Sequence, residues 1–297
     1  MKEGINSMKI SFITDEATQS FDEAIQFAKL HHLQGLELRS VDDTAIDNIS
    51  EAILKSWKLK LEESQLSVPC IAGSFYKCDI SEANVDLEIE KLKRLCRAAD
   101  ILDCKLIRGF TFMCPESGNM DPEDLVPYYS KAAEILKEYN KTLLLEADPC
   151  VNLTNHASLA ALLKELDPLY FGAIFDPGND LYDPFHERPF PDGYNAIKPY
   201  ARHIHIKDAV REGKEISCVK IGTGQVGYLP LLQQLIRDGY NGWLSMETHY
   251  RKDITLTEEQ LHHPQGASFT KGGMGATAEC IQALQSLLDN AESKAVL

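Results

Sequence analysis

The sequence contains no long run of apolar residues, and its first ten residues, MKEGINSMKI, include no apolar segment of the kind found in signal peptides. We therefore expect a chain that does not cross a membrane and that resides in the cytoplasm. Its eight cysteines include no CxxC pair. This absence excludes a zinc knuckle or a thioredoxin-type motif and favours free thiols in a reducing compartment.

Basic residues are few in comparison with acidic ones. The chain has 30 Lys and Arg against 45 Asp and Glu, which gives a formal net charge of −15. Such a charge opposes non-specific binding to nucleic acid or to an anionic membrane surface. A small anionic substrate stays compatible with it, because a binding site can be locally positive.

Short apolar segments alternate with amphipathic ones along the whole chain. The apolar segments are rich in Ile, Val, Leu and Phe, as expected for strands buried on both faces. Eight strands are predicted, at 9–14, 35–39, 67–73, 104–110, 142–147, 171–176, 202–207 and 242–248. Helices are predicted between and after them, at 20–33, 46–64, 82–102, 121–140, 155–166, 228–238 and 277–291, with a short helix within 183–200.

Eight strands that each precede a helix fit a (β/α)8 TIM barrel of typical length. No Gly/Ser linker or composition break divides the chain, so we assign one domain over 1–297, with an N-terminal extension at 1–8. The long segment 250–276 after the last strand is a candidate lid. A doubly wound open sheet is the alternative, and the lack of a GxGxxG motif after the first strand weakens it.

The strand 202–207 carries an unusual polar face. Successive side chains of a strand point to opposite faces, so His203, His205 and Lys207 share one face and the isoleucines between them share the other. We interpret His203, one repeat deeper than His205, as an interior histidine that supports the site through hydrogen bonds. We give His249, just beyond the last strand, a similar supporting role. The other histidines are interpreted as surface or lid residues: His31, His32, His156, His186, His262 and His263.

Side chains that can bind a metal occur at the ends of four consecutive strands. Glu146 and Asp176 end the fifth and sixth strands, His205 lies in the seventh, and Glu247 ends the eighth. The carboxyl ends of barrel strands are where active sites are built. Three carboxylates packed together would repel one another, and a divalent ion removes that repulsion. Three carboxylates and one imidazole suit Mn²⁺ best, with Mg²⁺, Co²⁺ or Zn²⁺ as alternatives.

The chain resembles the xylose isomerase-like TIM barrels of the sugar-phosphate isomerase/epimerase family. This superfamily also includes ketose 3-epimerases, inosose dehydratases and an apurinic endonuclease branch. The resemblance covers essentially the whole chain and is strongest in the second half. It rests on ELRSVDD (37–43), LLLEADP (143–149), IFDPGN (174–179), HIHIKDA (203–209) and IGTGQVGYLPLLQQLIRDGYNGWLSMETHY (221–250).

The resemblance implies roles for particular residues. It makes Glu146, Asp176, His205 and Glu247 the ligands of one metal ion, the set that the strand ends also indicate. In the ketose 3-epimerases the two glutamates act as acid and base on opposite faces of the substrate, so Glu146 and Glu247 take those roles here. Those epimerases carry a histidine three residues after the ligand aspartate, where this chain has Asn179. Substrate contacts at Asn179 are therefore expected to differ.

Four cationic side chains are candidates for substrate binding. Lys207 shares a face with His205 and is placed to neutralise an enediolate oxygen, with a salt bridge to a ligand acid as the alternative. Arg39, Arg108 and Lys271 are candidates for binding a phosphate or carboxylate. The chemistry expected of the site is removal of a proton next to a carbonyl, with a divalent ion stabilising the enediolate that forms.

The expected function is a metal-dependent isomerase or epimerase of a sugar or sugar phosphate. A metal-dependent dehydratase of a cyclic polyol is the alternative, because nothing in the sequence separates elimination from reprotonation. An endonuclease is disfavoured by the charge of −15 and by the lack of histidines between His32 and His156. A non-catalytic sugar-binding protein is disfavoured because all four ligand positions are intact. The expected partner is a small carbohydrate, with no nucleic acid or membrane, and a homodimer is the default assembly.

Overall fold

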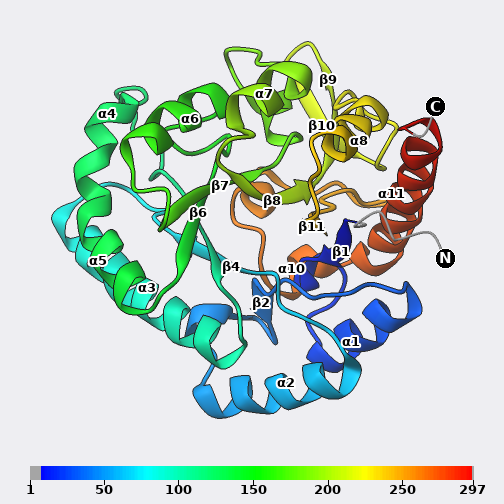
Figure 1. Cartoon of the computed structure of the whole chain (residues 1–297), viewed down its shortest axis with the longest axis horizontal. Helices are drawn as coiled ribbons and strands as arrows, with labels where there is room; N and C mark the ends of the chain where they lie inside the picture. Colours follow the sequence, from blue (N-terminus) through cyan, green and yellow to red (C-terminus); the bar gives the residue numbers. More distant parts are fainter. Residues whose placement is uncertain (1–7, 296–297) are drawn as a thin grey trace.

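The computed structural model of the chain describes residues 8–295. Except for Met8, the predicted N-terminal extension lies outside these residues. The described chain forms a curled parallel sheet inside a ring of helices, as Figure 1 shows. The predicted TIM barrel is therefore confirmed. None of the helices in the described residues is both long and apolar enough to span a bilayer.

The sheet pairs its strands in parallel in the order β1-β11-β8-β7-β6-β5-β4. Every residue of β6 and β7 is buried, as expected for parallel strands covered on both faces. The strand bounds are β1 (Lys9–Phe12), β4 (Cys70–Phe75), β5 (Leu106–Gly109), β6 (Thr142–Glu146), β7 (Phe171–Phe175), β8 (Ala201–Ile206) and β11 (Trp243–Met246).

The predicted second strand, 35–39, closes the barrel between β1 and β4 but pairs through isolated bridges. Ile13 bridges to Glu37 on one side, and Leu38 bridges to Ile71 on the other, both in parallel. Regular strand pairing therefore covers seven of the eight predicted strands. The remaining one, 35–39, is still held on both sides by the bridges. Glu37 thereby lies in the barrel interior, where it is fully buried.

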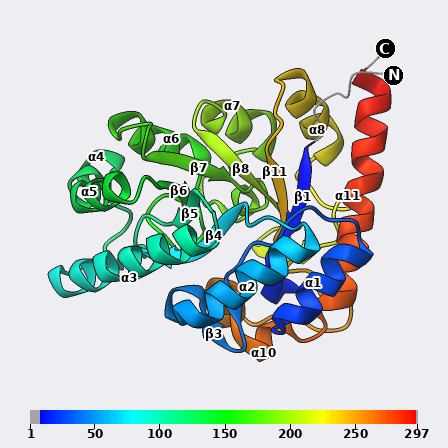
Figure 2. The same ribbon diagram turned by 60° about the horizontal axis from the view of Figure 1, so that its bottom comes forward.

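The helices lie outside the strands, and the two views in Figures 1 and 2 show α11 running beside α8. The predicted helix 121–140 is divided into α4 and α5 by a 3-10 turn (Val126–Tyr129) that contains Pro127. The bounds are α1 (Phe21–Leu30), α2 (Glu51–Ser64), α3 (Glu82–Ile101), α4 (Pro122–Leu125), α5 (Ser130–Glu138), α6 (His156–Glu165), α7 (Tyr194–Ile197), α8 (Tyr228–Arg237), α9 (Glu258–His262), α10 (Gly266–Thr270) and α11 (Gly273–Ala295).

A hairpin that the sequence pattern did not predict follows β8. Strands β9 (Asp208–Glu212) and β10 (Glu215–Val219) pair antiparallel, and Gly213 takes a positive φ of 65° in the turn. Charged residues in DAVREGKEISCV obscure the two-residue period of these strands. A second, smaller hairpin joins β2 (Ser40–Val41) to β3 (Thr44–Ala45).

Residues below the strand ends form a small apolar plug in the barrel. Leu144 and Ile174 each lie one side-chain repeat below an acid, Glu146 and Asp176 respectively, so they share its face. Together with Cys70 they form a fully buried cluster that is separate from the main core. Glu146 and Asp176 therefore lie directly above a packed apolar cluster.

The aspartate that follows β8 anchors the glycine-rich segment 221–227. Asp208 Oδ2 accepts hydrogen bonds from the amides of Gly222 and Gly224, both at 2.9 Å. Its Oδ1 accepts from the amide of Val226 at 3.3 Å. A Cβ added at Gly224 would lie 2.2 Å from this carboxylate, so only glycine allows such a close approach.

Replacing Asp208 by Asn is expected to lower the free energy of unfolding by about 2–4 kcal/mol, because an amide NH₂ would face backbone N–H donors that now have a carboxylate acceptor. Urea unfolding followed by circular dichroism measures the change. Asp289→Asn, at an exposed position of α11, is the matched control. An equal, small effect of both substitutions would contradict the anchoring role.

Candidate metal centre

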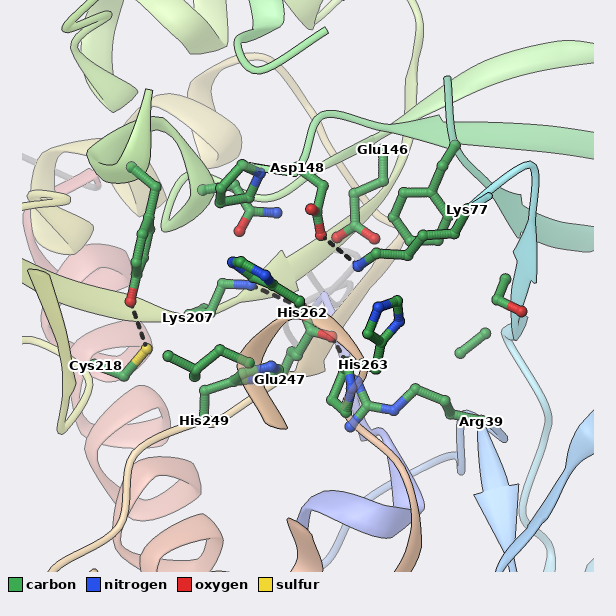
Figure 3. A pocket seen from close by; sticks show the side chains of 18 of the residues that line it. Arg39, Lys77, Glu146, Asp148, Lys207, Cys218, Glu247, His249, His262 and His263 are labelled. Atoms are coloured by element: carbon green, nitrogen blue, oxygen red, sulfur yellow. Dashed lines mark hydrogen bonds and ion pairs between the residues drawn. The ribbon is translucent and has the colours of Figure 1, made fainter. Parts of the chain in front are cut away.

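A cavity of about 770 Å³ opens where the barrel strands end. Its lining includes Glu146, Lys207 and Glu247 at the bottom, the hairpin β9–β10 on one side, and the segment between β11 and α11 on another. Figure 3 shows these side chains converging from separate elements. The cavity volume is typical of a site for a small molecule.

The four side chains expected to bind a metal come together at the base of this cavity. Glu146, Asp176, His205 and Glu247 each offer a ligand atom, and these atoms all lie within 4.8 Å of one another. Glu146 ends β6 and His205 lies in β8, while Asp176 and Glu247 directly follow β7 and β11. These four strands are neighbours in the sheet. The two glutamates therefore lie at the ends of an arc, with the aspartate and the histidine between them.

Protonated groups compensate the carboxylates in this arrangement. His205 Nδ1 lies 2.8 Å from Glu146 Oε1. The ammonium group of Lys207 lies 2.7 Å from Asp176 Oδ2 and 3.0 Å from Glu247 Oε2. The cluster thus already holds positive charge at the point where its ligand atoms converge. A divalent cation would supply the same compensation.

The donor set fits a divalent cation. Asp176 Oδ2 is buried and, despite its ion pair with Lys207, has no hydrogen-bond donor in a suitable direction. Buried carboxylate oxygens are normally hydrogen-bonded or bound to a metal. Three carboxylates with one imidazole are oxygen-rich, which suits Mn²⁺ or Mg²⁺ and is also compatible with Zn²⁺.

The pKa values of the carboxyl groups differ within the cluster. Burial, together with the nearby carboxylates of Glu247 and Glu146, raises the pKa of Asp176 to about 7, against the opposing charge of Lys207. Burial acts in the same direction on Glu247, but Lys207 and His205 hold the pKa of that carboxyl well below its usual range. A buried acid that is surrounded by like charges is stabilised by a bound cation.

The two predicted arginines reach the cluster but contact its acids. Arg39 Nη1 lies 2.8 Å from Glu247 Oε1, and its Nη2 lies 2.8 Å from Glu16 Oε1. Arg108 Nη1 lies 3.2 Å from Glu146 Oε2, and its Nε donates to the carbonyl of Gly73. Both guanidinium groups are therefore occupied in orienting and neutralising carboxylates.

Of the two remaining candidates for substrate binding, the structure places one in the cavity lining and the other outside it. Asn179 lines the cavity, and its side-chain amide donates to the carbonyl of Ala147 at 2.8 Å. Lys271 is exposed and is not among the residues that line the cavity, so the structure does not support its predicted role in substrate binding.

The two supporting histidines lie beside the cluster and contact buried acids. His203 Nε2 is 2.8 Å from Glu37 Oε2, and His205 Nε2 is 3.1 Å from the other oxygen of the same carboxylate. His249 Nδ1 lies 3.1 Å from Glu16 Oε1. Sequence reasoning missed Glu37 as a site residue, although it lies in the predicted strand 35–39, where it shares one face with the polar Arg39.

Replacing Glu37 by Gln is expected to weaken divalent-metal affinity about 10–100-fold, the usual cost of losing the partner of a ligating histidine. The carboxylate holds Nε2 of His205, which leaves Nδ1 facing the other three ligands. Competition titration with a fluorescent chelator measures the affinity. Glu62→Gln, at an exposed position of α2, is the control, and equal affinities of the two variants would contradict the role of Glu37.

Three further histidines had been interpreted as surface or lid residues. The structure contradicts this for one of them and places the other two at the cavity. His156, the first residue of α6, is fully buried, and its Nδ1 lies 2.6 Å from Asp180 Oδ1. Its assignment to the surface was therefore wrong. His262 and His263 lie in the segment after β11 and line the cavity. Lys77 and Asp148, which form a 2.9 Å ion pair in the cavity wall, were not predicted at all.

Comparisons with known proteins agree with this fold. The model of the family described as xylose isomerase-like TIM barrel matches residues 25–271. A stretch of 140 residues is 29% identical to the uncharacterized protein MJ1311 of Methanocaldococcus jannaschii. That match covers 44% of this chain and 45% of the archaeal protein.

Several solved structures share the architecture at low sequence identity. An L-ribulose 3-epimerase superposes with a TM-score of 0.74 at 15% identity, over 97% of each chain. The IOLI protein, solved with a zinc atom, gives 0.71 at 14%, over 97% of this chain and 99% of that one. A Mycobacterium smegmatis protein in complex with magnesium gives 0.68 at 14%, over 96% and 97%. Since the family model matches most of its length, the chain belongs to the xylose isomerase-like TIM-barrel family.

Proposed function

We propose that the chain is a divalent-metal-dependent isomerase or epimerase that moves a proton next to the carbonyl group of a sugar or sugar phosphate. The observation that carries this proposal is the arc of Glu146, Asp176, His205 and Glu247 at the base of the cavity. It combines a donor set for one divalent ion with two glutamates at opposite ends of the arc. The epimerase among the structural neighbours adds support at the level of the fold.

The two glutamates are the groups that move the proton. They lie at the ends of different strands, β6 and β11, and at either end of the arc, so a substrate bound between them presents one face to Glu146 and the other to Glu247. One carboxylate removes the proton from the carbon next to the carbonyl, and the other, after it takes a proton from solvent, returns one. Return to the same carbon from the other face gives an epimer, and return to the neighbouring carbon gives an isomer.

The cations around the glutamates prepare them for this role. Arg39 and Arg108 hold Glu247 and Glu146 in place through the ion pairs described above. Lys207, which contacts Asp176 and Glu247, offers an ammonium donor for a substrate oxygen that gains negative charge. A divalent ion, when bound by the four ligands, would polarise the carbonyl and acidify the adjacent C–H group.

Mn²⁺ is the metal that we propose, because three carboxylates and one imidazole make a mainly oxygen donor set. Two structural neighbours were solved with zinc and with magnesium, which supports a divalent ion in a barrel of this fold without selecting one. Isothermal titration of the metal-free protein with Mn²⁺, Mg²⁺, Co²⁺ and Zn²⁺ ranks the affinities directly.

Solvent deuterium incorporation tests the proposed reaction. Mn²⁺-loaded protein is incubated in D₂O with a panel of ketoses, ketose phosphates, aldoses and inososes, and each C–H signal is followed by NMR. Exchange next to a carbonyl, accompanied by an epimer or isomer, supports the proposal. Loss of the proton with a dehydrated product points instead to a metal-dependent dehydratase. Absence of exchange across the panel, with one bound ion per chain, contradicts the proposed reaction for these sugars.

A further inference from the structure

A second group of side chains that can bind a metal lies at the beginning of α6. His156 Nδ1 lies 2.6 Å from Asp180 Oδ1 and 3.8 Å from Glu187 Oε2. Each of the three residues offers a ligand atom, and these atoms all lie within 4.8 Å of one another. This group, which we call the α6 cluster, shares no residue with the metal centre at the base of the cavity, and none of its three side chains lines that cavity.

The α6 cluster carries buried negative charge. The side chains of His156 and Asp180 are fully buried, and that of Glu187 is 11% exposed. In the part of the chain that the structure describes, neither acid forms an ion pair with Lys or Arg. Asp183 adds another buried carboxylate, which accepts from the amide of Glu187 at 3.0 Å. Such a group of acids is stabilised by a cation.

One oxygen of the cluster is buried without a donor. Asp180 Oδ2 has no hydrogen-bond partner among the described residues. A Cβ added at Gly193 would lie 2.5 Å from this oxygen and 3.2 Å from Glu187 Oε2, so both oxygens face one point that glycine leaves open. Two carboxylate oxygens that face each other repel unless they share a proton or a cation. Buried carboxylate oxygens are normally hydrogen-bonded or bound to a metal.

The electrostatics of the cluster agree with this geometry. Burial raises the pKa of both acids, and the charge of Asp180 raises the pKa of Glu187 further. Although burial lowers it, the pKa of His156 is raised by the charges of Asp180 and Glu187. All three shifts result from buried negative charge that additional positive charge would compensate.

A second, smaller cavity gives access to the cluster. It has a volume of about 260 Å³, and Asp180 and Glu187 are among its lining residues, so an ion and its water ligands can reach both carboxylates. Two arginines in the cavity wall have other partners. Arg188 pairs with Asp192 at 2.6 Å, and Arg211 Nη2 donates to the carbonyl of Asp183 at 2.8 Å.

The donor set favours Zn²⁺ among the divalent ions. Zn²⁺ accepts imidazole and carboxylate ligands together, and three protein ligands can be completed by water. Ca²⁺ requires six to eight oxygen ligands, and Mn²⁺ binds mixed nitrogen and oxygen sites more weakly than Zn²⁺ does. Ligand atoms on one zinc ion lie about 3 Å apart, so His156 Nδ1 and Asp180 Oδ1 need to separate only slightly from 2.6 Å.

We propose that His156, Asp180 and Glu187 form a second metal site, which binds Zn²⁺ and is separate from the metal centre in the cavity. The ion joins the beginning of α6 to the 3-10 turn Asn179–Tyr182 after β7 and to the loop before α7, which lies beside α6 (Figure 1). Asn179 and Tyr182 line the large cavity, so the site holds part of its wall. This inference does not depend on the proposed function.

The number of bound ions tests the second site. The full chain is freed of metal with a chelator, dialysed against Zn²⁺ or Mn²⁺ at equal concentration, and analysed for metal content. The wild type should hold two zinc ions but one manganese ion per chain. Asp176→Ala, which removes a ligand of the metal centre, should still hold one zinc ion. One zinc ion in the wild type and none in Asp176→Ala would overturn the inference and would indicate that Asp180 and Glu187 share a proton instead.

A ligand variant excludes zinc bound elsewhere on the acidic surface. Glu187→Gln, added to Asp176→Ala, should weaken zinc binding about 10–100-fold in a competition titration with a chelator. Glutamine still offers an oxygen to the amides of His156 and Ala157, which Glu187 now accepts, so α6 keeps its first turn. Glu165→Gln, at the exposed end of α6, is the matched control. Equal affinities in the two variants would overturn the inference.

Diffraction at the zinc absorption edge locates the ion even if a variant does not fold. Wild-type crystals soaked with Zn²⁺ should show an anomalous peak within bonding distance of His156, Asp180 and Glu187. Absence of a peak there, with zinc present at the metal centre or on the surface, would overturn the second site and would leave the proposed function untouched.

Discussion

Glu146→Gln and Glu247→Gln should each lower the rate of substrate interconversion by a factor of about 10²–10⁴, the usual contribution of a positioned acid or base. Glutamine keeps the size of the side chain and one oxygen, but it cannot accept a proton from carbon at neutral pH. The metal should still bind, since glutamine keeps a carbonyl oxygen that can act as a ligand beside the other three side chains. Turnover of the best substrate from the deuterium panel, with metal content measured in parallel, tests the expectation.

The two variants should also differ from each other in an informative way. Because the glutamates lie at opposite ends of the arc, each is expected to exchange the proton of only one of the two epimers. Glu146→Gln should keep exchange in the epimer whose proton faces Glu247, and the reverse should hold for Glu247→Gln. Glu165→Gln, at an exposed position of α6, is the control. Loss of exchange in both epimers from either substitution would contradict the two-base arrangement.

Removal of the metal site should abolish both activity and metal-dependent stabilisation. Mn²⁺ at about 100 times its dissociation constant is expected to stabilise the wild type by about 2.7 kcal/mol, since it binds the folded state. For a domain of this size that corresponds to an increase of roughly 5 °C in melting temperature. Asp176→Ala removes one ligand and also the buried oxygen that lacks a hydrogen-bond donor, so the increase should disappear.

Differential scanning fluorimetry with and without Mn²⁺ measures this effect, and dialysis against a chelator should remove it from the wild type. Asp253→Ala, at an exposed position, controls for non-specific binding of cations to an acidic protein. If Asp176→Ala keeps the full increase, the ion binds elsewhere, and the carboxylate–histidine group of Glu37, His203 and His205 becomes the next site to examine.

The part of the site that could be predicted follows from the geometry of strands. The acids at the ends of LLLE and AIFD share an inward face with a buried apolar residue two positions earlier, and Glu247 at the end of LSME shares it with the buried Ser245. Parallel strands also end at the same edge. Order along the chain therefore indicated that Glu146, Asp176 and Glu247 lie near His205. Whether these residues bind a metal remains a prediction.

The part that could not be predicted depends on contacts between distant segments. Arg39 looked like a free cation because its partners Asp15 and Glu247 are far away in the sequence. Glu37 lies next to His203 only after the barrel has closed through the isolated bridges of the second strand. The loop histidines His262 and His263 carry no periodic signal at all, yet they line the cavity from the segment after β11.

X-ray diffraction from Mn²⁺-soaked crystals, recorded at the manganese absorption edge, tests the central claim most directly. We predict one anomalous peak at the base of the cavity, within bonding distance of Glu146, Asp176, His205 and Glu247. Lys207 is expected to have moved away from Asp176, because the ion takes over its charge compensation. A peak elsewhere in the protein, or an empty cavity with Lys207 still paired to Asp176, would contradict the metal-dependent mechanism.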